Sequence, residues 1–203
     1  MPTHLEAYVG PMFSAKTERL ISELKRATYA GKRILVLKPA RDTRTEAFIA
    51  SRQVHPDGST SITEKFPARI IGSVDEFREA TAANDFDVLA IDEAQFFPLD
   101  EPVQDSLGWF GREIRALLQA RRADSLRVLI AGLDTDFAEN PFGIMPGILA
   151  LADSVEKLSA VCMTCGSYEA HKSQRLTEEK SEVAVGDADM YQARCRACFS
   201  SPA

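Results

Sequence analysis

The chain has 203 residues, of which 45% are hydrophobic, enough for one ordinary domain with a core and a small appendage. Its 30 acidic and 24 basic residues give a formal net charge of −6, which argues against general nucleic-acid or membrane binding, because such proteins usually present a basic face. With neither a signal segment nor an apolar run of about 18 residues, we expect a cytoplasmic protein that binds no nucleic acid and no membrane.

A degenerate phosphate-binding loop follows the first predicted strand. The apolar stretch 5–9 leads into Gly-Pro-Met-Phe-Ser-Ala-Lys-Thr at 10–17. In the pattern G-x-x-x-x-G-K-[ST], backbone N–H groups surround phosphate oxygens, the lysine reaches the outer phosphates and the hydroxyl binds Mg²⁺. Gly10, Lys16 and Thr17 are in register, and Ala15 replaces the second glycine. Apolar positions at helical spacing between 20 and 27 predict a helix whose N-terminus faces the anion, although an ordinary strand-turn-helix would look the same.

The remaining pattern alternates buried strands with helices. Gly31 is a plausible helix C-cap, and apolar runs predict strands at 33–37, 68–71, 88–91 and 128–131. Ser73 opens a capping box for a helix to about 83, and a longer helix is expected over 102–123. Residues 38–67 are predicted to form a long loop that could contain one hairpin. The alternation indicates an α/β domain with a largely parallel sheet and ligands at the carboxyl ends of its strands.

An acidic pair ends the strand at 88–91. Asp92 and Glu93 are adjacent, so on a strand they point to opposite sides and would take different roles, one at a metal ion and one at a nucleophile. Acidic loop residues that merely follow a strand are the alternative. The phosphate loop at a compatible place favours the Mg²⁺–ATP interpretation.

All four cysteines occur as two C-x-x-C pairs separated by 29 residues (166–194). This pattern favours a tetrahedral Zn²⁺ site. Unligated cysteines and a redox C-x-x-C are the alternatives, and His171 could replace one ligand. The composition becomes polar near Ser159, so we place a domain boundary there, with a phosphate-loop domain at 1–158 and a metal-stapled domain at 159–203.

Two further segments could serve the same site. Aromatic and apolar residues follow the strand at 128–131, at 132–137 and 140–143, and they could stack on a flat base or simply pack the loop. Arg44 could brace a phosphate, although a solvated arginine is the common alternative.

In combination, these motifs resemble the type II, zinc-containing thymidine kinase family. The resemblance rests on the segment 10–17, Lys-Pro ahead of Asp42-Thr43-Arg44, Asp-Glu-Ala-Gln-Phe-Phe at 92–97, Gly-Leu-Asp-Thr-Asp-Phe at 132–137, and Tyr191 ahead of the second cysteine pair. It implies a P-loop NTPase-like (RecA-like) fold, with a mostly parallel sheet flanked by helices, plus a small C-terminal zinc-binding domain with a lasso-like loop at about 182–191.

The resemblance also implies an activity: transfer of the γ-phosphate of ATP to the 5′-hydroxyl of thymidine, with deoxyuridine also possible, giving dTMP in nucleotide salvage. Glu93 would be the general base, and Lys16 and Arg44 would neutralise the transferred phosphoryl group. The residues expected to bind ATP and Mg²⁺ are Gly10, Pro11, Met12, Phe13, Ser14, Ala15, Lys16, Thr17, Asp42, Asp92 and Gln95. Those expected to contact the nucleoside are Met12, Phe96, Leu133, Phe137, Phe142, Val183, Val185, Gly186 and Tyr191. A structural Zn²⁺ would bind Cys162, Cys165, Cys195 and Cys198, and a homotetramer or homodimer is expected.

Two rival interpretations remain. A methyl group at Ala15 could distort the phosphate loop, which would leave a nucleoside- or ATP-binding protein with impaired catalysis. Asp-Glu-Ala-Gln could instead be a helicase box, but 203 residues leave no room for a second motor domain.

Overall fold

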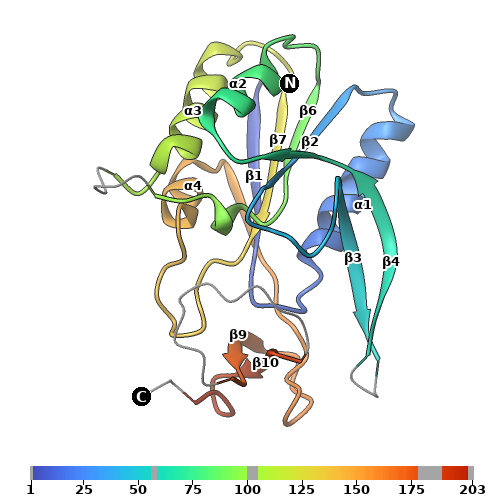
Figure 1. Ribbon diagram of the computed structural model, residues 1–203, viewed down its shortest axis with the longest axis vertical. Coiled ribbons are helices and arrows are strands. Elements are labelled where there is room, and N and C mark those ends of the chain that lie inside the picture. The colour runs from blue at the N-terminus through green and yellow to red at the C-terminus, as the bar shows by residue number, and fades with distance from the viewer. Residues whose placement is uncertain (1, 56–58, 100–104, 178–188, 201–203) are drawn as a thin grey trace.

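A six-stranded sheet forms the centre of the molecule (Figure 1). The computed structural model describes residues 2–55, 59–99, 105–177 and 189–200. The strand order is β5-β2-β6-β7-β1-β8 and every pair is parallel. This confirms the predicted α/β fold. The strands are β1 (His4–Val9), β2 (Ile34–Pro39), β5 (Arg69–Ile71), β6 (Val88–Ile91), β7 (Arg127–Gly132) and β8 (Ser154–Lys157).

Helices cover both faces of the sheet (Figure 1). Successive side chains of a strand point to opposite faces, so Val128 and Ile130 pack into one core and Leu129 and Ala131 into the other. The first core is covered by α2 (Val74–Thr81), α3 (Gly108–Ala120) and α4 (Met145–Leu151), and the second by α1 (Lys16–Tyr29). Burial on both faces explains why the central strands are continuous apolar runs in the sequence.

The helices differ from the prediction mainly in length. The capping box of α2 is present, because the Ser73 hydroxyl accepts the Glu76 N–H and the Glu76 carboxylate accepts the Ser73 N–H, both at 3.2 Å. Of the helix predicted over 102–123, residues 102–104 lie outside the described residues, and α3 begins at Gly108 and ends at Ala120. Asp105 accepts the N–H groups of residues 107 and 108 in the turn ahead of it, and Gly108 has φ 57°, which is outside the conformation of a right-handed helix.

Several short elements were not predicted as separate units, and four of them belong to the segments 38–67 and 145–157. The segment 38–67 contains the hairpin of β3 (Phe48–Val54) and β4 (Thr60–Pro67), which lies beside α1 (Figure 1). The other two are α4 and the edge strand β8. All four residues of β8 are exposed, so it lacks the apolar run that identifies the central strands.

A small antiparallel pair, β9 (Ala170–Arg175) and β10 (Tyr191–Cys195), lies at the carboxyl end of the sheet (Figure 1). The domain boundary between 158 and 159 stays a prediction. Val183, Val185, Gly186 and most of the predicted lasso-like loop lie outside the described residues. Among the residues that are described, no helix is long and apolar enough to cross a membrane.

Candidate active site

The phosphate-loop candidate connects β1 to α1. Gly10 has φ +145°, and a Cβ atom there would lie 2.3 Å from the carbonyl oxygen of Leu158, so only glycine fits. Ala15 adopts the left-handed conformation, with φ 60° and ψ 26°. The loop therefore takes a conformation that favours glycine at the position where this chain has alanine.

Two side chains of the loop face the end of the neighbouring strands. The ammonium group of Lys16 donates to the carbonyl oxygen of Pro11 at 2.6 Å. The Thr17 hydroxyl donates to the carboxylate of Asp92, 3.0 Å from Oδ2, and Asp92 follows β6. A hydroxyl beside a buried carboxylate at the start of a helix is an arrangement suited to an octahedral cation.

Glu93 belongs to a chain of charged groups behind the loop. Its Oε1 lies 2.5 Å from Nη2 of Arg44, and Arg44 Nε donates to Asp42 at 2.8 Å. Asp42 also pairs with Lys38 at 3.1 Å, and the Lys38 side chain is buried. Lys38 was not among the predicted site residues. It neutralises Asp42, which in turn holds the guanidinium group of Arg44 against Glu93.

Burial and the neighbouring charges separate the pKa values of the two acidic residues. Burial, followed by the nearby Glu93 carboxylate, raises the pKa of Asp92. Burial alone would also raise the pKa of Glu93, but Arg44 and Lys16 outweigh it, so this pKa is lowered. Burial lowers the pKa of Lys16, against the opposing effect of Glu93 and Asp92. The site therefore holds Glu93 as a carboxylate.

A pocket joins the phosphate loop to a set of aromatic side chains. Met12 to Thr17 and the side chains of Arg44 and Glu93 line one part of it. The part predicted to contact a nucleoside is lined by Met12, Phe96, Leu133, Phe137, Phe142 and Tyr191. Asp42, Asp92 and Gln95 lie behind the lining and contact residues that form it.

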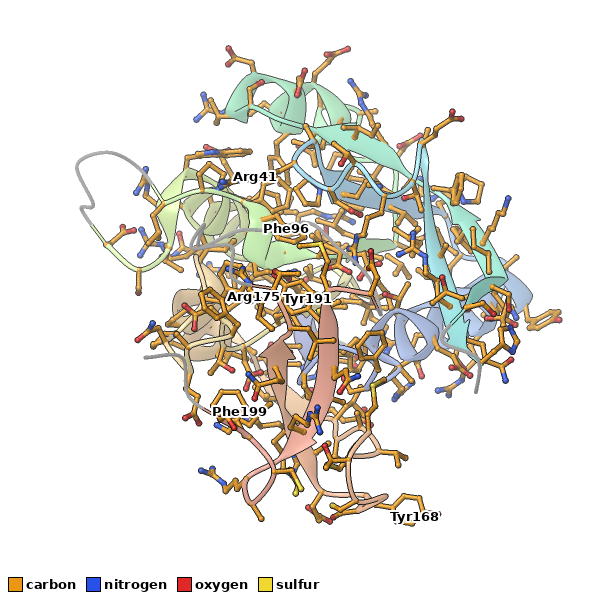
Figure 2. The ribbon with its side chains drawn as sticks, turned by 60° about the horizontal axis from the view of Figure 1, so that its bottom comes forward. Arg41, Phe96, Tyr168, Arg175, Tyr191 and Phe199 are labelled. Carbon is orange, nitrogen blue, oxygen red and sulfur yellow. The ribbon has the colours of Figure 1, made fainter. Side chains whose placement is uncertain are left out.

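Arg175 lies in the same pocket and was not predicted. Its guanidinium carbon lies 3.6 Å from the centre of the Phe137 ring, and Nη2 donates to the Tyr191 hydroxyl at 2.8 Å. Figure 2 shows Arg175 and Tyr191 side by side at the end of the β9–β10 hairpin that faces the sheet. An arginine within a polar strand has no periodic signal, so nothing in the sequence pattern distinguished it.

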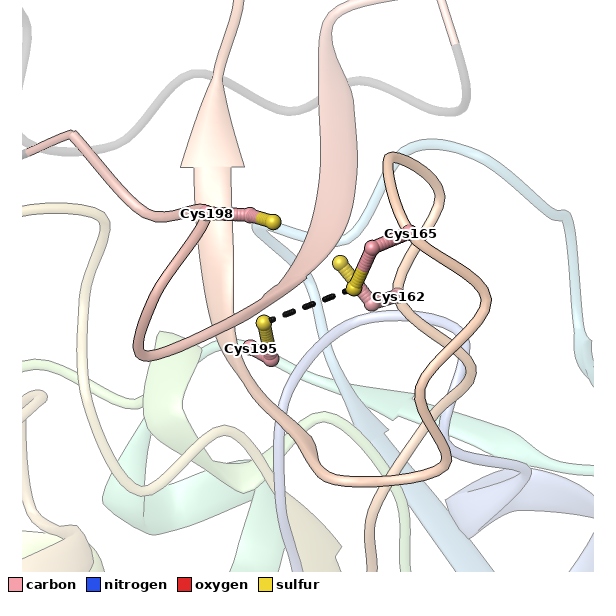
Figure 3. Close-up of side chains that lie close together, drawn as sticks. All are labelled: Cys162, Cys165, Cys195 and Cys198. Atoms are coloured by element: carbon pink, nitrogen blue, oxygen red, sulfur yellow. Dashed lines mark hydrogen bonds between the residues drawn. The ribbon is translucent and has the colours of Figure 1, made fainter.

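The four cysteines form a cluster beyond the pocket (Figure 3). Their sulfur atoms all lie within 4.8 Å of one another, and Cys165 and Cys195 are 3.8 Å apart. A tetrahedral site with Zn–S bonds of about 2.3 Å has edges of about 3.8 Å. The cluster could therefore bind a metal ion, and its spacing fits tetrahedral thiolate coordination.

The cysteine cluster also contacts the phosphate loop. Phe13 packs against the small core that contains Cys162 and Cys195. The N–H of Met12 donates to the hydroxyl of Ser173 on β9 at 3.0 Å. The hairpin and the phosphate loop are thus held together at the pocket.

Comparison with known proteins gives a consistent family assignment. The thymidine kinase family model matches residues 3–199. The thymidine kinase of Deinococcus deserti is 40% identical over 200 residues, covering 95% of this chain and 92% of that protein. The thymidine kinase of Mycoplasma mobile is 37% identical over 194 residues, covering 96% and 86%. That of Coprothermobacter proteolyticus is 40% identical over 197 residues, covering 94% and 87%. The chain belongs to the thymidine kinase family.

Proposed function

We propose that the chain is an ATP-dependent thymidine kinase that phosphorylates the 5′-hydroxyl of thymidine, and also that of deoxyuridine, to give dTMP or dUMP for nucleotide salvage. The observation that carries this proposal is the pocket in which Lys16 and Thr17 meet the Glu93 carboxylate and the aromatic wall of Phe137 and Tyr191. Such a pocket has a place for a triphosphate, a base for the acceptor hydroxyl and a flat apolar surface for a pyrimidine.

The phosphates of ATP would lie over the N-terminus of α1. Backbone N–H groups of the loop 10–17 would surround them, and the helix dipole favours the negative charge. Lys16 and Arg44 would leave their present partners, the Pro11 carbonyl and Glu93, and neutralise the charge that spreads over the transferred group. Thr17 and Asp92 would hold Mg²⁺, which would supply positive charge to offset that of the phosphates.

Glu93 would accept the proton of the 5′-hydroxyl as the oxygen attacks the γ-phosphate. Its lowered pKa keeps it ionised at neutral pH. A carboxylate is a weak base, but phosphoryl transfer passes through a loose transition state and depends mainly on positioning and electrostatics. Glu93 would therefore act chiefly by orienting the hydroxyl and by taking its proton late.

The nucleoside would bind between the loop after β7 and the β9–β10 hairpin. Leu133 and Phe137 would cover the base from one side and Met12 from another, with Tyr191 held by Arg175. We propose a structural Zn²⁺ at Cys162, Cys165, Cys195 and Cys198, because four thiolates at this spacing suit that ion. Zn²⁺ would fix the hairpin that carries Arg175 and Tyr191.

We further propose that the protein is cytoplasmic and forms a homotetramer or homodimer, as the family resemblance implies. A second candidate function follows from the left-handed conformation of Ala15. If the methyl group prevents productive binding of the phosphates, the chain would bind nucleoside and ATP without efficient transfer. A strain on the order of 1 kcal/mol corresponds to less than a tenfold change in an equilibrium, so we favour the active enzyme.

The test is a product assay with purified protein, ATP, Mg²⁺ and a series of nucleosides. We expect dTMP from thymidine and a slower reaction with deoxyuridine, and no reaction without Mg²⁺. Calorimetry with thymidine provides the control for binding. Tight thymidine binding without any product would favour the second candidate, and binding of neither thymidine nor ATP would exclude both.

A further inference from the structure

Gln95 occupies an unusual position for a polar side chain next to an active site. It lies in the 3₁₀ helix η1 (Ala94–Phe96), two residues after Glu93, and is only 2% exposed. Its side chain does not line the pocket. Since a buried amide must be hydrogen-bonded at both ends to be stable, its partners indicate what it does.

The backbone fixes which way the amide points. The N–H of Leu133 can only donate, and it donates to Oε1 of Gln95 at 3.0 Å. The amide nitrogen must then face the other way, where it donates to Oε2 of Glu93 at 2.5 Å. Gly132 leaves the space for this arrangement, because a Cβ atom there would lie 2.8 Å from the Gln95 oxygen.

The two oxygens of Glu93 are therefore held by different donors. Arg44 holds Oε1 and Gln95 holds Oε2. The Arg44 contact faces the pocket, and under the proposed function this guanidinium turns to the phosphates when ATP binds. The Gln95 contact lies behind the pocket and does not depend on the nucleotide. It would remain when Oε1 is released to the acceptor hydroxyl.

We infer that Gln95 is a positioning residue that holds Oε2 of Glu93 and thereby directs Oε1 at the acceptor hydroxyl, while it ties this carboxylate to the backbone of Leu133 in the nucleoside pocket. The inference rests on the proposed function and adds a residue to it. Gln95 is buried and does not line the pocket, so it acts through Glu93 rather than through contact with ATP or Mg²⁺.

The tests are the variants Gln95→Glu and Gln95→Met. Gln95→Glu keeps the size of the side chain and the acceptor for the Leu133 N–H but replaces the amide donor with a second carboxyl group, which repels Glu93 or shares one proton with it. We expect kcat to fall by about 10- to 100-fold, as for loss of a group that orients a catalytic base. The KM for ATP and the Kd for thymidine should stay within about threefold, because neither ligand touches the amide. Gln95→Met removes both hydrogen bonds and should reduce kcat at least as much.

The matched control is Gln119→Met on the exposed face of α3, which should leave kcat unchanged. A crystal structure of the Gln95→Glu variant supplies a second readout, in which the Glu93 side chain should have left its position. Unchanged kcat, or a loss of thymidine affinity equal to the loss of kcat, would overturn the inference. An unmodified protein without kinase activity would refute the proposed function instead, and the position of Glu93 in the variant would still decide whether Gln95 holds it.

Discussion

The substitution Ala15→Gly tests how the phosphate loop tolerates its missing glycine. Ala15 has φ 60° in the folded loop, so we expect its strain to oppose folding. A left-handed alanine costs about 1–2 kcal/mol, and glycine removes this cost. Glycine also destabilises the fold by about 0.5–1 kcal/mol, because the unfolded chain has more conformational freedom at a glycine. We therefore expect Ala15→Gly to raise the free energy of unfolding by roughly 0.5–1 kcal/mol.

The assay combines urea unfolding with steady-state kinetics. A change of this size should raise Tm by about 2 °C for a protein of this length, while the KM for ATP and kcat stay within twofold. The matched control is Ala116→Gly, at an exposed position inside α3, which should destabilise by about 1 kcal/mol because glycine disfavours a helix. A fivefold fall in the KM for ATP with no gain in stability would contradict this expectation, because it would show that the strain arises only when ATP binds.

Three further predictions concern the core, the metal and the nucleoside pocket. The buried Glu23 accepts hydrogen bonds from three arginines, which overcome the effect of burial and lower its pKa below the usual 4.5, so Glu23→Gln should cost about 1–3 kcal/mol in urea unfolding at pH 7. A carboxyl group whose pKa is lowered by folding stabilises the fold above its unfolded pKa, and this contribution is lost as the pH falls through the folded pKa. The difference in unfolding free energy between the unmodified protein and Glu23→Gln should therefore shrink below pH 4.5. A difference that stays constant would contradict the stabilising role of ionised Glu23. Metal analysis should find one zinc per chain, and Cys165→Ser should lower both zinc content and Tm; a fully folded protein without zinc would remove the site. Tyr191→Phe deletes the hydroxyl that Arg175 contacts at 2.8 Å. It should raise the KM for thymidine about 3- to 10-fold and leave the KM for ATP unchanged. Equal changes in the two KM values would count against a role of Tyr191 in the nucleoside pocket.

The sequence predicted those parts of the fold that leave a strong local pattern. Strands buried on both faces are continuous apolar runs, which is why β6 and β7 were found close to their true bounds. The edge strand β8 is exposed at every residue, and the β3–β4 hairpin has no continuous apolar run, so neither had a clear signal. Their formation depends on neighbours that are distant in the chain.

The residues of the candidate site also differ in how strongly the sequence pattern indicates them. Lys16, Thr17, Asp92 and Glu93 belong to motifs with fixed spacing, and the fold brings them to the same edge of the sheet. Lys38, by contrast, looks like a surface lysine at the end of a strand. Only the fold shows that it is buried beside Asp42.

Gln95 illustrates a second limit. The family resemblance implied that it binds ATP or Mg²⁺, which stays a prediction. Its contact with the backbone of Leu133, 38 residues away in the chain, was not predicted. A contact of this kind depends on how the ends of two parallel strands are placed in space. Periodicity and spacing in one sequence contain no information about it.

We propose that Glu93 receives the proton of the acceptor hydroxyl when thymidine is phosphorylated. The most direct measurement is the kcat of Glu93→Gln with ATP, Mg²⁺ and thymidine, together with the Kd for thymidine. A general base at this position predicts a loss of about 10²- to 10⁴-fold in kcat, with the Kd for thymidine changed by less than threefold. A kcat within fivefold of the unmodified protein would contradict it.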